Sequence, residues 1–360
     1  MLKKMTALAL SFCVAIGAAG CNKKEASSGG LTDGYACTMI VTPESVKLDK
    51  GFLEKYKDVK NVVLPEDYDK NLDKITDEIA SFADSEKVKC IIVCSDKEGM
   101  LPVFEKIKEK NEDITTIAAG VEEIQNEDKQ DDVIMNEDIN IGFNPTDKDN
   151  NQNAVRMAEA MGAKVFVNYV DEFAKDGVEF KQKNREMQRE CEKNGIKYVE
   201  VLVSGMKDEN DSKTAEEFIK KDAANKKKSY GENVALYGCR EAMDKATIDA
   251  AMENKLMVPN IHSLNSTKLY GDILGVDVSG SDYTEINSKI SEKLKSMGME
   301  GRLAGTDIPE KVFCVEIALD TANKLYKKKV EENELLSDIR ADIKEKTGIW
   351  AEYNLSLIHI

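Results

Sequence analysis

The sequence is poor in the residues on which much enzyme chemistry depends. It has two histidines, His262 and His359, in 360 residues, together with one tryptophan and six prolines. It contains no G-x-S-x-G elbow, P-loop, H-E-x-x-H or G-x-G-x-x-G motif. We therefore expect that the protein is not an enzyme. The catalytic alternative is a carboxylate-based hydrolase, which needs none of these motifs.

Positive charge is also scarce. Lysine and arginine total 51 against 67 aspartate and glutamate residues, which gives a formal net charge of −16. An acidic surface disfavours nucleic acid and anionic lipid headgroups, so we expect no nucleic-acid partner. At 360 residues, the chain exceeds the usual size of a domain with a single hydrophobic core, which favours two domains.

The eight cysteines show no close metal-type spacing. Cys13 and Cys21 belong to the N-terminal region, and Cys90 and Cys94 lie within one apolar run. We interpret the six cysteines outside the N-terminal region as small buried hydrophobes and expect no metal and no cofactor. These six are Cys37, Cys90, Cys94, Cys191, Cys239 and Cys314.

The N-terminus, MLKKMTALALSFCVAIGAAGC, carries two lysines, an apolar run and a small-residue site directly before Cys21. This pattern is typical of a signal peptide over residues 1–20. The cysteine after the small-residue site resembles the lipobox of bacterial lipoproteins. The resemblance implies that Cys21 is acylated (palmitate), that residues 21–34 form a flexible tether, and that the protein is exported and anchored to the outer face of the cell membrane. The alternative is an ordinary signal peptide.

The rest of the chain alternates between strand and helix patterns around residues 139–162. There, a buried-strand run at 139–143 ends at Asn144-Pro145, and a polar loop leads to a helix from Ala154. Apolar runs on either side predict parallel strands and right-handed crossovers. The expected strands are 37–41, 61–64, 88–94, 114–119 and 139–143 before the break, and 164–169, 197–203, 233–238 and 256–260 after it.

This alternation predicts an α/β protein with two Rossmann-like lobes, each with a parallel sheet, joined by a hinge. We expect lobe 1 to contain residues 35–145 and about 302–350, and lobe 2 to contain 146–301. After Tyr353 the sequence has no helix pattern, and Ser356–Ile360 resembles translated adapter sequence. We interpret 354–360 as a tail foreign to the native fold.

Three segments carry a resemblance to a known family: GAKVFVNY at 162–169, NGIKYVEV at 194–201 and YGENVALYGCREAMDKATI at 230–248. With the lipobox and the two strand–helix arrays, they resemble type I periplasmic-binding-protein-like lipoproteins, and most closely an uncharacterised lipoprotein family of that class. The resemblance implies a tethered solute receptor that serves an ABC permease. The alternative is a sensory module with the same fold that presents its ligand-bound form to a membrane receptor.

Ligands of open α/β sheets bind outside the carboxyl ends of the strands. The mixture of carboxylates, amides, hydroxyls and rings at these ends suits a small polar metabolite such as a sugar or a nucleoside, with Tyr68 and Tyr169 available for stacking. The alternative is that these residues cap helices and complete turns. The candidates are Glu66, Asp67, Tyr68, Ser95, Asp96, Asn144, Asn168, Tyr169, Ser204, Arg240, Asn260 and His262.

Two features have sharper alternatives. Arg240 follows a predicted strand and is suited to clamping a carboxylate or phosphate, or else to pairing at the surface with Glu241 or Asp244. The run Asp147–Asn153 is similar to a calcium loop, but its sixth position is Gln152 where glycine is required, and its twelfth is Ala158. We therefore interpret this run as the loop before a helix.

Overall fold

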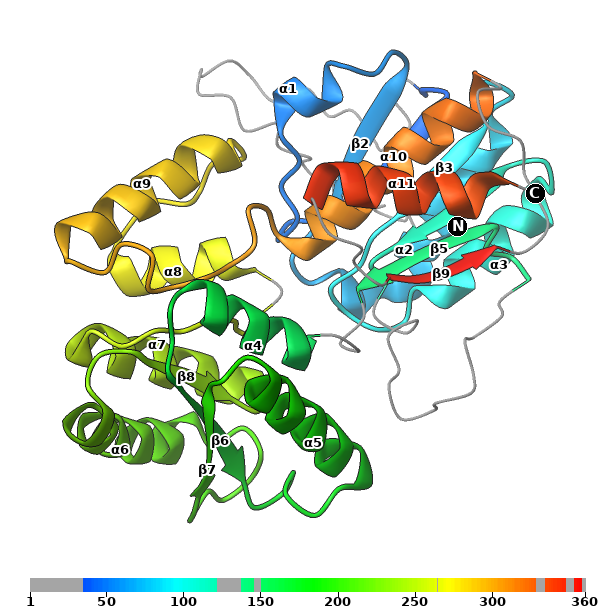
Figure 1. The fold of residues 1–360 in the computed structure, drawn as a ribbon. Helices are drawn as coiled ribbons and strands as arrows, with labels where there is room; N and C mark the ends of the chain where they lie inside the picture. Colours follow the sequence, from blue (N-terminus) through cyan, green and yellow to red (C-terminus); the bar gives the residue numbers. More distant parts are fainter. Residues whose placement is uncertain are drawn as a thin grey trace, which may run out of the picture.

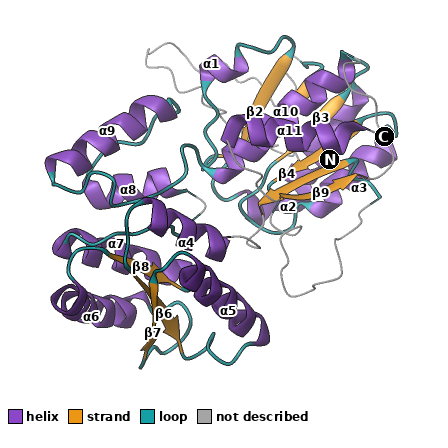
Figure 2. Cartoon of the chain, in the orientation of Figure 1, coloured by secondary structure: helices purple, strands orange, loops and turns teal. Residues whose placement is uncertain are grey.

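A computed structural model describes residues 35–121, 137–145, 150–263, 265–327, 334–347 and 353–357. The predicted signal peptide, Cys21, the tether and the loop 146–149 lie outside these residues. The described chain forms two bodies, each built on its own β-sheet with helices on both faces (Figures 1 and 2). None of the helices in these ranges is both long enough and apolar enough to span a membrane.

The first sheet has the strand order β2-β1-β3-β4-β5-β9. Strands β1 to β5 are parallel, as predicted, but β9 pairs with β5 in the antiparallel direction, so the sheet is mixed. Four of the five residues of β9 belong to the segment interpreted as a foreign tail. The strands are β1 (Thr38–Pro43), β2 (Val59–Leu64), β3 (Cys90–Val93), β4 (Thr115–Ala119), β5 (Ile141–Pro145) and β9 (Tyr353–Leu357).

Helices cover both faces of the first sheet, which explains its continuous apolar strands. Met39 and Ile91 face one layer of helices, whereas their neighbours Ile40 and Ile92 face the other. The first layer contains α2 (Leu72–Ala80) and α3 (Leu101–Lys110), with the 3-10 turns η1 (Tyr68–Asn71) and η2 (Ser81–Asp84). The second layer contains α1 (Lys50–Leu53), α10 (Glu310–Tyr326) and α11 (Leu335–Thr347).

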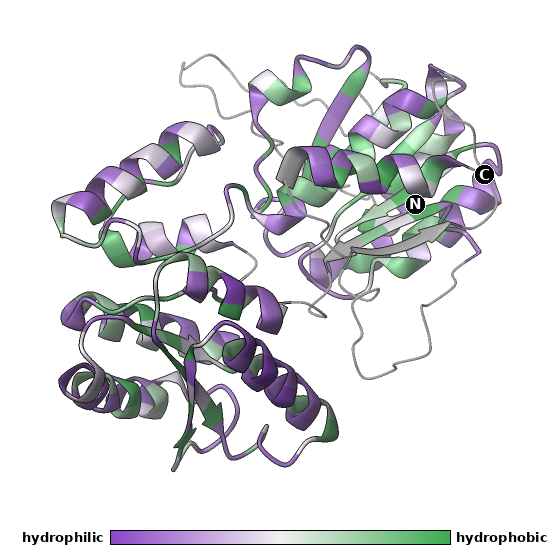
Figure 3. Cartoon of the chain, viewed as in Figure 1, coloured by the Kyte–Doolittle hydropathy of each residue, from purple (hydrophilic) through white to green (hydrophobic). Residues whose placement is uncertain are grey.

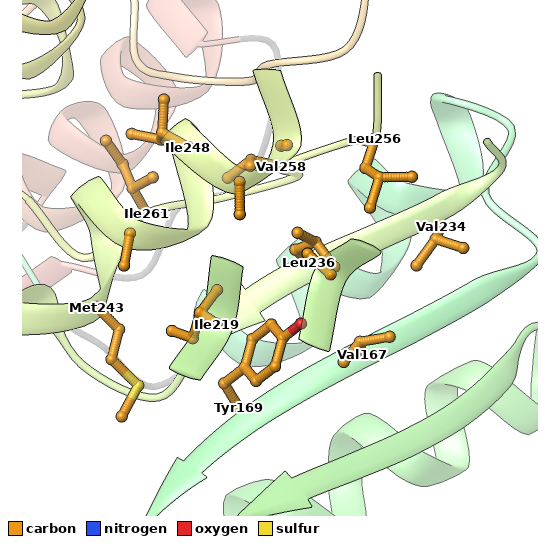
Figure 4. Close-up of a cluster of buried hydrophobic side chains, with 14 of the residues drawn as sticks. Val167, Tyr169, Ile219, Val234, Leu236, Met243, Ile248, Leu256, Val258 and Ile261 are labelled. Carbon is orange, nitrogen blue, oxygen red and sulfur yellow. The ribbon is translucent and has the colours of Figure 1, made fainter. Parts of the chain in front are cut away.

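The second sheet is parallel, with the order β7-β6-β8. Phe166 and Tyr237 face one layer, and Tyr169 and Leu236 face the larger cluster drawn in Figure 4. The strands are β6 (Val165–Asp171), β7 (Lys197–Val203) and β8 (Val234–Gly238). The helices are α4 (Asn150–Ala160) and α5 (Val178–Lys193) on one face, and α6 (Ser212–Tyr230) and α7 (Asp244–Asn254), which follows the 3-10 turn η4 (Glu241–Met243), on the other.

The prediction of a full strand over 256–260 was wrong. This segment makes single bridges only, from Met257 to Ala235 of β8 and from Val258 to Leu303. On each side only one residue of this segment pairs with its neighbour, which is too short a ladder for a strand. The two bridges nevertheless continue the second sheet beyond β8. The segment ends close to the carboxyl end of β8, where the His262 ring nitrogen Nε2 lies 2.7 Å from the Gly238 carbonyl oxygen.

Two further helices, α8 (Ser266–Leu274) and α9 (Tyr283–Ser296), pack on the core of the second sheet. Sequence reasoning found α9 but missed α8, because the buried face of α8 contains threonine and glycine as well as Tyr270 and Leu274. Its start and end were nevertheless marked, by Asn265 as N-cap and by Gly275 in the left-handed conformation.

The two bodies meet at the segment that joins α8 to α9. Tyr283 packs against the core of each sheet, and its hydroxyl donates to the Lys47 carbonyl at 2.8 Å. The Lys47 ammonium in turn donates to the Ser279 carbonyl at 3.1 Å. Figure 3 shows apolar residues on many of the strands and polar residues on much of the helix surface. The buried side chains of each sheet form their own clusters, so this junction lies between two cores.

Candidate ligand pocket

A pocket of about 690 Å³ lies at this junction. One wall comes from the first sheet, through residues of 43–47, 65–68 and 96–97 that follow β1, β2 and β3. The other wall comes from α8 and from the segment 277–283. A volume of this order suits a small ligand, since small-molecule sites commonly measure about 300–1,000 Å³.

The strand order explains why the pocket forms here. After β1 the chain moves outward to β2, and it then crosses back to place β3 on the opposite side of β1. The loops that follow β1 and β3 therefore diverge and leave a crevice at the carboxyl end of the sheet. Pro43 closes β1 at this edge, and Asp96 follows β3.

Asp96 is held in place by two hydroxyl groups. The Tyr68 hydroxyl donates to one carboxylate oxygen at 3.0 Å, and the Ser45 hydroxyl donates to the other. Tyr68 is 1% exposed, and burial, reinforced by the nearby charge of Asp96, raises the pKa of its phenol. The phenol therefore stays protonated and keeps donating, which fixes a carboxylate that has no ion-pair partner among the described residues.

The remaining charges of the pocket are mostly acidic. Lys97 donates to Asp69 at 2.8 Å, which is the main cause of its raised pKa, and it lies 5.3 Å from the centre of the Tyr68 ring. A backbone N–H donated by Ser279 lowers the pKa of Asp277 and keeps that carboxylate charged. The carboxylates of the lining are Glu44, Glu66, Asp96, Asp272 and Asp277, and the ammonium groups are Lys47, Lys97 and Lys268.

Of the twelve candidates, the pocket brings together Glu66, Tyr68 and Asp96. Asp67 lies beside them on the exposed surface. The Ser95 side chain is buried, and its carbonyl accepts from the Lys311 ammonium at 2.5 Å. Asn144 is the second-to-last residue of β5, and its side chain is not among those that the structure describes.

Candidates from the second sheet lie away from the pocket lining. The Asn168 amide is buried and donates to Tyr198 and Asn184, at 2.9 and 3.1 Å. The Tyr169 hydroxyl donates to Asp222 at 3.2 Å from within the core. Ser204 is exposed and Asn260 half-buried. The structure therefore supports packing and core hydrogen bonding for Asn168 and Tyr169.

Arg240 pairs with neither of the carboxylates proposed for it. Its guanidinium instead contacts Asp171, which is fully buried at the end of β6, and donates to Glu209 at 2.9 Å. The sequence alternative named Glu241 and Asp244 because they are near in the chain, whereas parallel pairing of β6 and β8 brings Asp171 closer in space. These two carboxylates offset the positive charge that Arg240 would need to bind an anionic ligand.

His262 belongs to a turn that leads into α8. Its backbone N–H donates to the Asp244 carboxylate at 2.9 Å, and the N–H of Ser263 donates to the same oxygen at 2.8 Å. His262 thus lies outside the lining but helps to place the helix that forms one wall.

Sequence reasoning missed Ser45, Thr267 and Tyr283 of the lining. Ser45 had a usable signal, because it follows the proline that ends β1. Thr267 could have been found only by recognising α8, and Tyr283 carries no local signal that it contacts a distant lobe.

The described residues contain no group of three or more histidine, cysteine or acidic side chains suited to a metal ion. Of the six cysteines in these ranges, Cys90, Cys94, Cys191 and Cys314 are buried, whereas Cys37 and Cys239 are half-buried. The calcium-loop alternative falls partly on residues 146–149, outside the description, and Asn150 already begins α4.

A family model described as a protein of unknown function, DUF3798, matches residues 38–304. The chain belongs to the DUF3798 family. The expected resemblance to an uncharacterised family is thereby confirmed. No curated protein matches the sequence.

One solved structure supports the α/β fold, and two others match more weakly. A protein of Clostridium difficile 630 with the provisional description of a transcriptional regulator matches with a TM-score of 0.71 and 24% identity, over 89% of this chain and 97% of that one. A periplasmic ribose ABC transporter protein from Conexibacter woesei matches at 0.38 and 14% identity, over 80% and 96%. An ABC transporter solute-binding protein from Burkholderia multivorans matches at 0.40 and 15%, over 81% and 94%. The likeness to the Clostridium difficile protein concerns the fold alone, and none of the three matches identifies a ligand.

Proposed function

We propose that this DUF3798 protein is an extracytoplasmic solute-binding protein that takes a small polar metabolite, sugar- or nucleoside-like, between its two lobes. The observation that carries the proposal is the pocket of about 690 Å³ between the carboxyl edge of the first sheet and α8. Its walls come from both lobes, so a ligand there contacts both at once.

The chemistry of the lining supports a ligand rich in hydrogen-bond donors. Asp96 is oriented by Ser45 and Tyr68 and has acceptor capacity left, since a carboxylate offers about four lone-pair sites. The half-buried Tyr283 side chain adds apolar surface. Hydroxyl groups of a sugar or of a ribose ring fit such acceptors.

The predicted lipid on Cys21 would hold this binding protein at the outer face of the membrane, where an ABC permease is the expected partner. A membrane receptor is the alternative partner, because a sensor would use the same pocket. Solute uptake by a deletion strain separates the two: lost uptake supports transport, and unchanged uptake with lost signalling supports sensing.

Binding itself is tested by thermal shift on the chain from Asn22, which retains every described residue, against sugars, nucleosides and other polar metabolites. A ligand at a hundredfold excess over its Kd stabilises the folded state by about 2.7 kcal/mol, or about 4 °C in Tm for a chain of this size.

Asp96→Asn should abolish the shift, because it converts one oriented acceptor into a donor. Asp222→Asn is the matched control, since Asp222 also accepts a tyrosine hydroxyl, from Tyr169, but lies outside the lining. Absence of a shift with every compound, or equal loss in both variants, would contradict the proposed function.

A further inference from the structure

The first turn of α8 forms part of the pocket wall through Asn265, Thr267 and Lys268. The Asn265 side chain caps the helix by accepting from the Lys268 N–H at 2.9 Å, and the Asn265 carbonyl accepts from Leu269. The N–H groups of Ser266 and Thr267 have no acceptor in the described part of the chain. Two donors at the positive end of the helix dipole are thus left over.

The Thr267 side chain independently indicates that a hydrogen-bonding group of a ligand binds at the start of α8. The residue borders the pocket and is 3% exposed, yet its hydroxyl oxygen has no hydrogen-bond partner among the described residues. Leaving a buried hydroxyl unpaired costs free energy, and native proteins rarely do so without a reason. An incoming acceptor would satisfy this hydroxyl.

The opposite wall, formed by the first sheet, contains carboxylates together with the ammonium groups of Lys47 and Lys97. Asp96, Glu44 and Glu66 present carboxylates, of which Asp96 is already oriented by two hydroxyl groups. A ligand that spans the pocket would meet the oriented Asp96 carboxylate on the side of the first sheet and the Thr267 N–H at the start of α8. On the wall of α8 the Lys268 ammonium lies 3.5 Å from the Asp272 carboxylate, which offsets its charge, so binding of an acceptor there depends on the N–H and hydroxyl donors.

We propose that the first turn of α8, with the Thr267 hydroxyl, is a subsite for a carboxylate group of the ligand, whose hydroxyl or ammonium donors face Asp96. This inference rests on the proposed function and narrows its ligand to polar compounds that carry a carboxylate. A planar carboxylate can accept from neighbouring backbone N–H groups and from a hydroxyl together. Sugar acids and amino acids both have this combination of groups.

The test uses the chain from Asn22 and compares each acid with its neutral counterpart: glucuronate with glucose, galacturonate with galactose, and L-amino acids with their amides. Nucleosides and glucose 6-phosphate complete the panel. Binding is measured by calorimetry for wild type, for Thr267→Val and for Thr321→Val. Thr321 is a matched control, because it is also buried on a helix with an unpartnered hydroxyl but lies on α10, outside the pocket lining.

An acid should bind at least tenfold more tightly than its neutral counterpart, and Thr267→Val should remove a tenfold or greater part of that affinity, as expected for a hydrogen bond to a charged group. Thr321→Val should leave binding unchanged. Neither variant should lower Tm in the absence of ligand, because each replaces an unpaired buried hydroxyl with a methyl group. Whether sugar acids or amino acids bind then identifies which donors meet Asp96.

Three outcomes would overturn the inference while leaving the proposed function in place. They are equal affinity for acids and neutral counterparts, preference for glucose 6-phosphate over glucuronate, and unchanged affinity for the acid in Thr267→Val. If no compound of the panel binds to wild type, the proposed function and this inference fail together.

Discussion

Asp244 shows how one buried side chain makes the fold depend on pH. It is 3% exposed at the start of α7, and burial raises its pKa from 3.8 to about 6. The charge of His262 and the two N–H donors of the His262 turn oppose this rise, and Glu241 adds to it. The folded chain therefore holds this proton more tightly than the unfolded chain does.

A raised carboxyl pKa stabilises the fold at low pH, and the unfolding free energy should fall as pH rises from about 4 through 6. We expect a loss of about 3 kcal/mol at most, because each pKa unit corresponds to about 1.36 kcal/mol. Asp244→Asn keeps an acceptor oxygen without the charge. The free energy of unfolding of this variant, relative to wild type, should therefore increase as pH rises from about 4 to 6. Urea unfolding at pH 4.5, 5.5 and 7 measures the difference. Exposed Glu253→Gln on the same helix is the control, and a difference for Asp244→Asn that is flat with pH would refute this account.

At the scale of one element, α8 is fixed to its surroundings through Gly271. A Cβ atom on Gly271 would lie 2.4 Å from Val278 Cγ1 and 3.2 Å from the Val276 carbonyl oxygen. The segment 276–278 therefore lies directly against the helix, and Val278 is also part of the pocket wall.

Gly271→Ala should destabilise the protein. Alanine favours the helix by about 1 kcal/mol, but overpacking costs about 1–3 kcal/mol. The Val276 carbonyl belongs to the backbone and cannot move away as easily as a side chain. We also expect weaker ligand binding, since Val278 would be displaced. Exposed Ser288→Ala on α9 gains helix propensity without new contacts and should be neutral or slightly stabilising. A higher Tm for Gly271→Ala than for wild type would show that the segment 276–278 adapts freely.

At the scale of the whole molecule, the pocket is shared by two lobes that are held together near it by Tyr283 and Lys47. Residues 144–145 end β5, and α4 starts the second lobe at Asn150. We predict that Asn144-Pro145, at the end of β5, acts as a hinge, because hinges concentrate dihedral changes in a few residues at the ends of elements. Ligand should then change the angle between the lobes.

Small-angle scattering with and without the best ligand tests this prediction, and Asp96→Asn with the same ligand serves as control. Wild type should show a more compact profile when bound, whereas the variant should not. Superimposable profiles for free and bound wild type would rule out a ligand-driven hinge.

The sequence by itself determined the alternation of strands and helices on which both sheets are built. Parallel strands covered on both faces must be apolar along their whole length, as in Cys90–Val93, so they stand out against the amphipathic helices between them. The prolines at 43 and 145 lie at the ends of β1 and β5, and the alternation of strand and helix requires parallel crossovers. These signals are local, and local signals can be read along one chain.

Only the tertiary structure decided which of these ends form the pocket. Strand order placed Asp96 beside Ser45, and parallel pairing of β6 and β8 placed Arg240 against Asp171. The packing of α8 and α9 brought Thr267 and Tyr283 to the edge of the first sheet. Such contacts join residues tens to hundreds of positions apart, as between Lys47 and Tyr283, and they depend on how whole layers pack. No spacing in the sequence encodes them, because the free energy that selects them comes from burying two cores and their junction together.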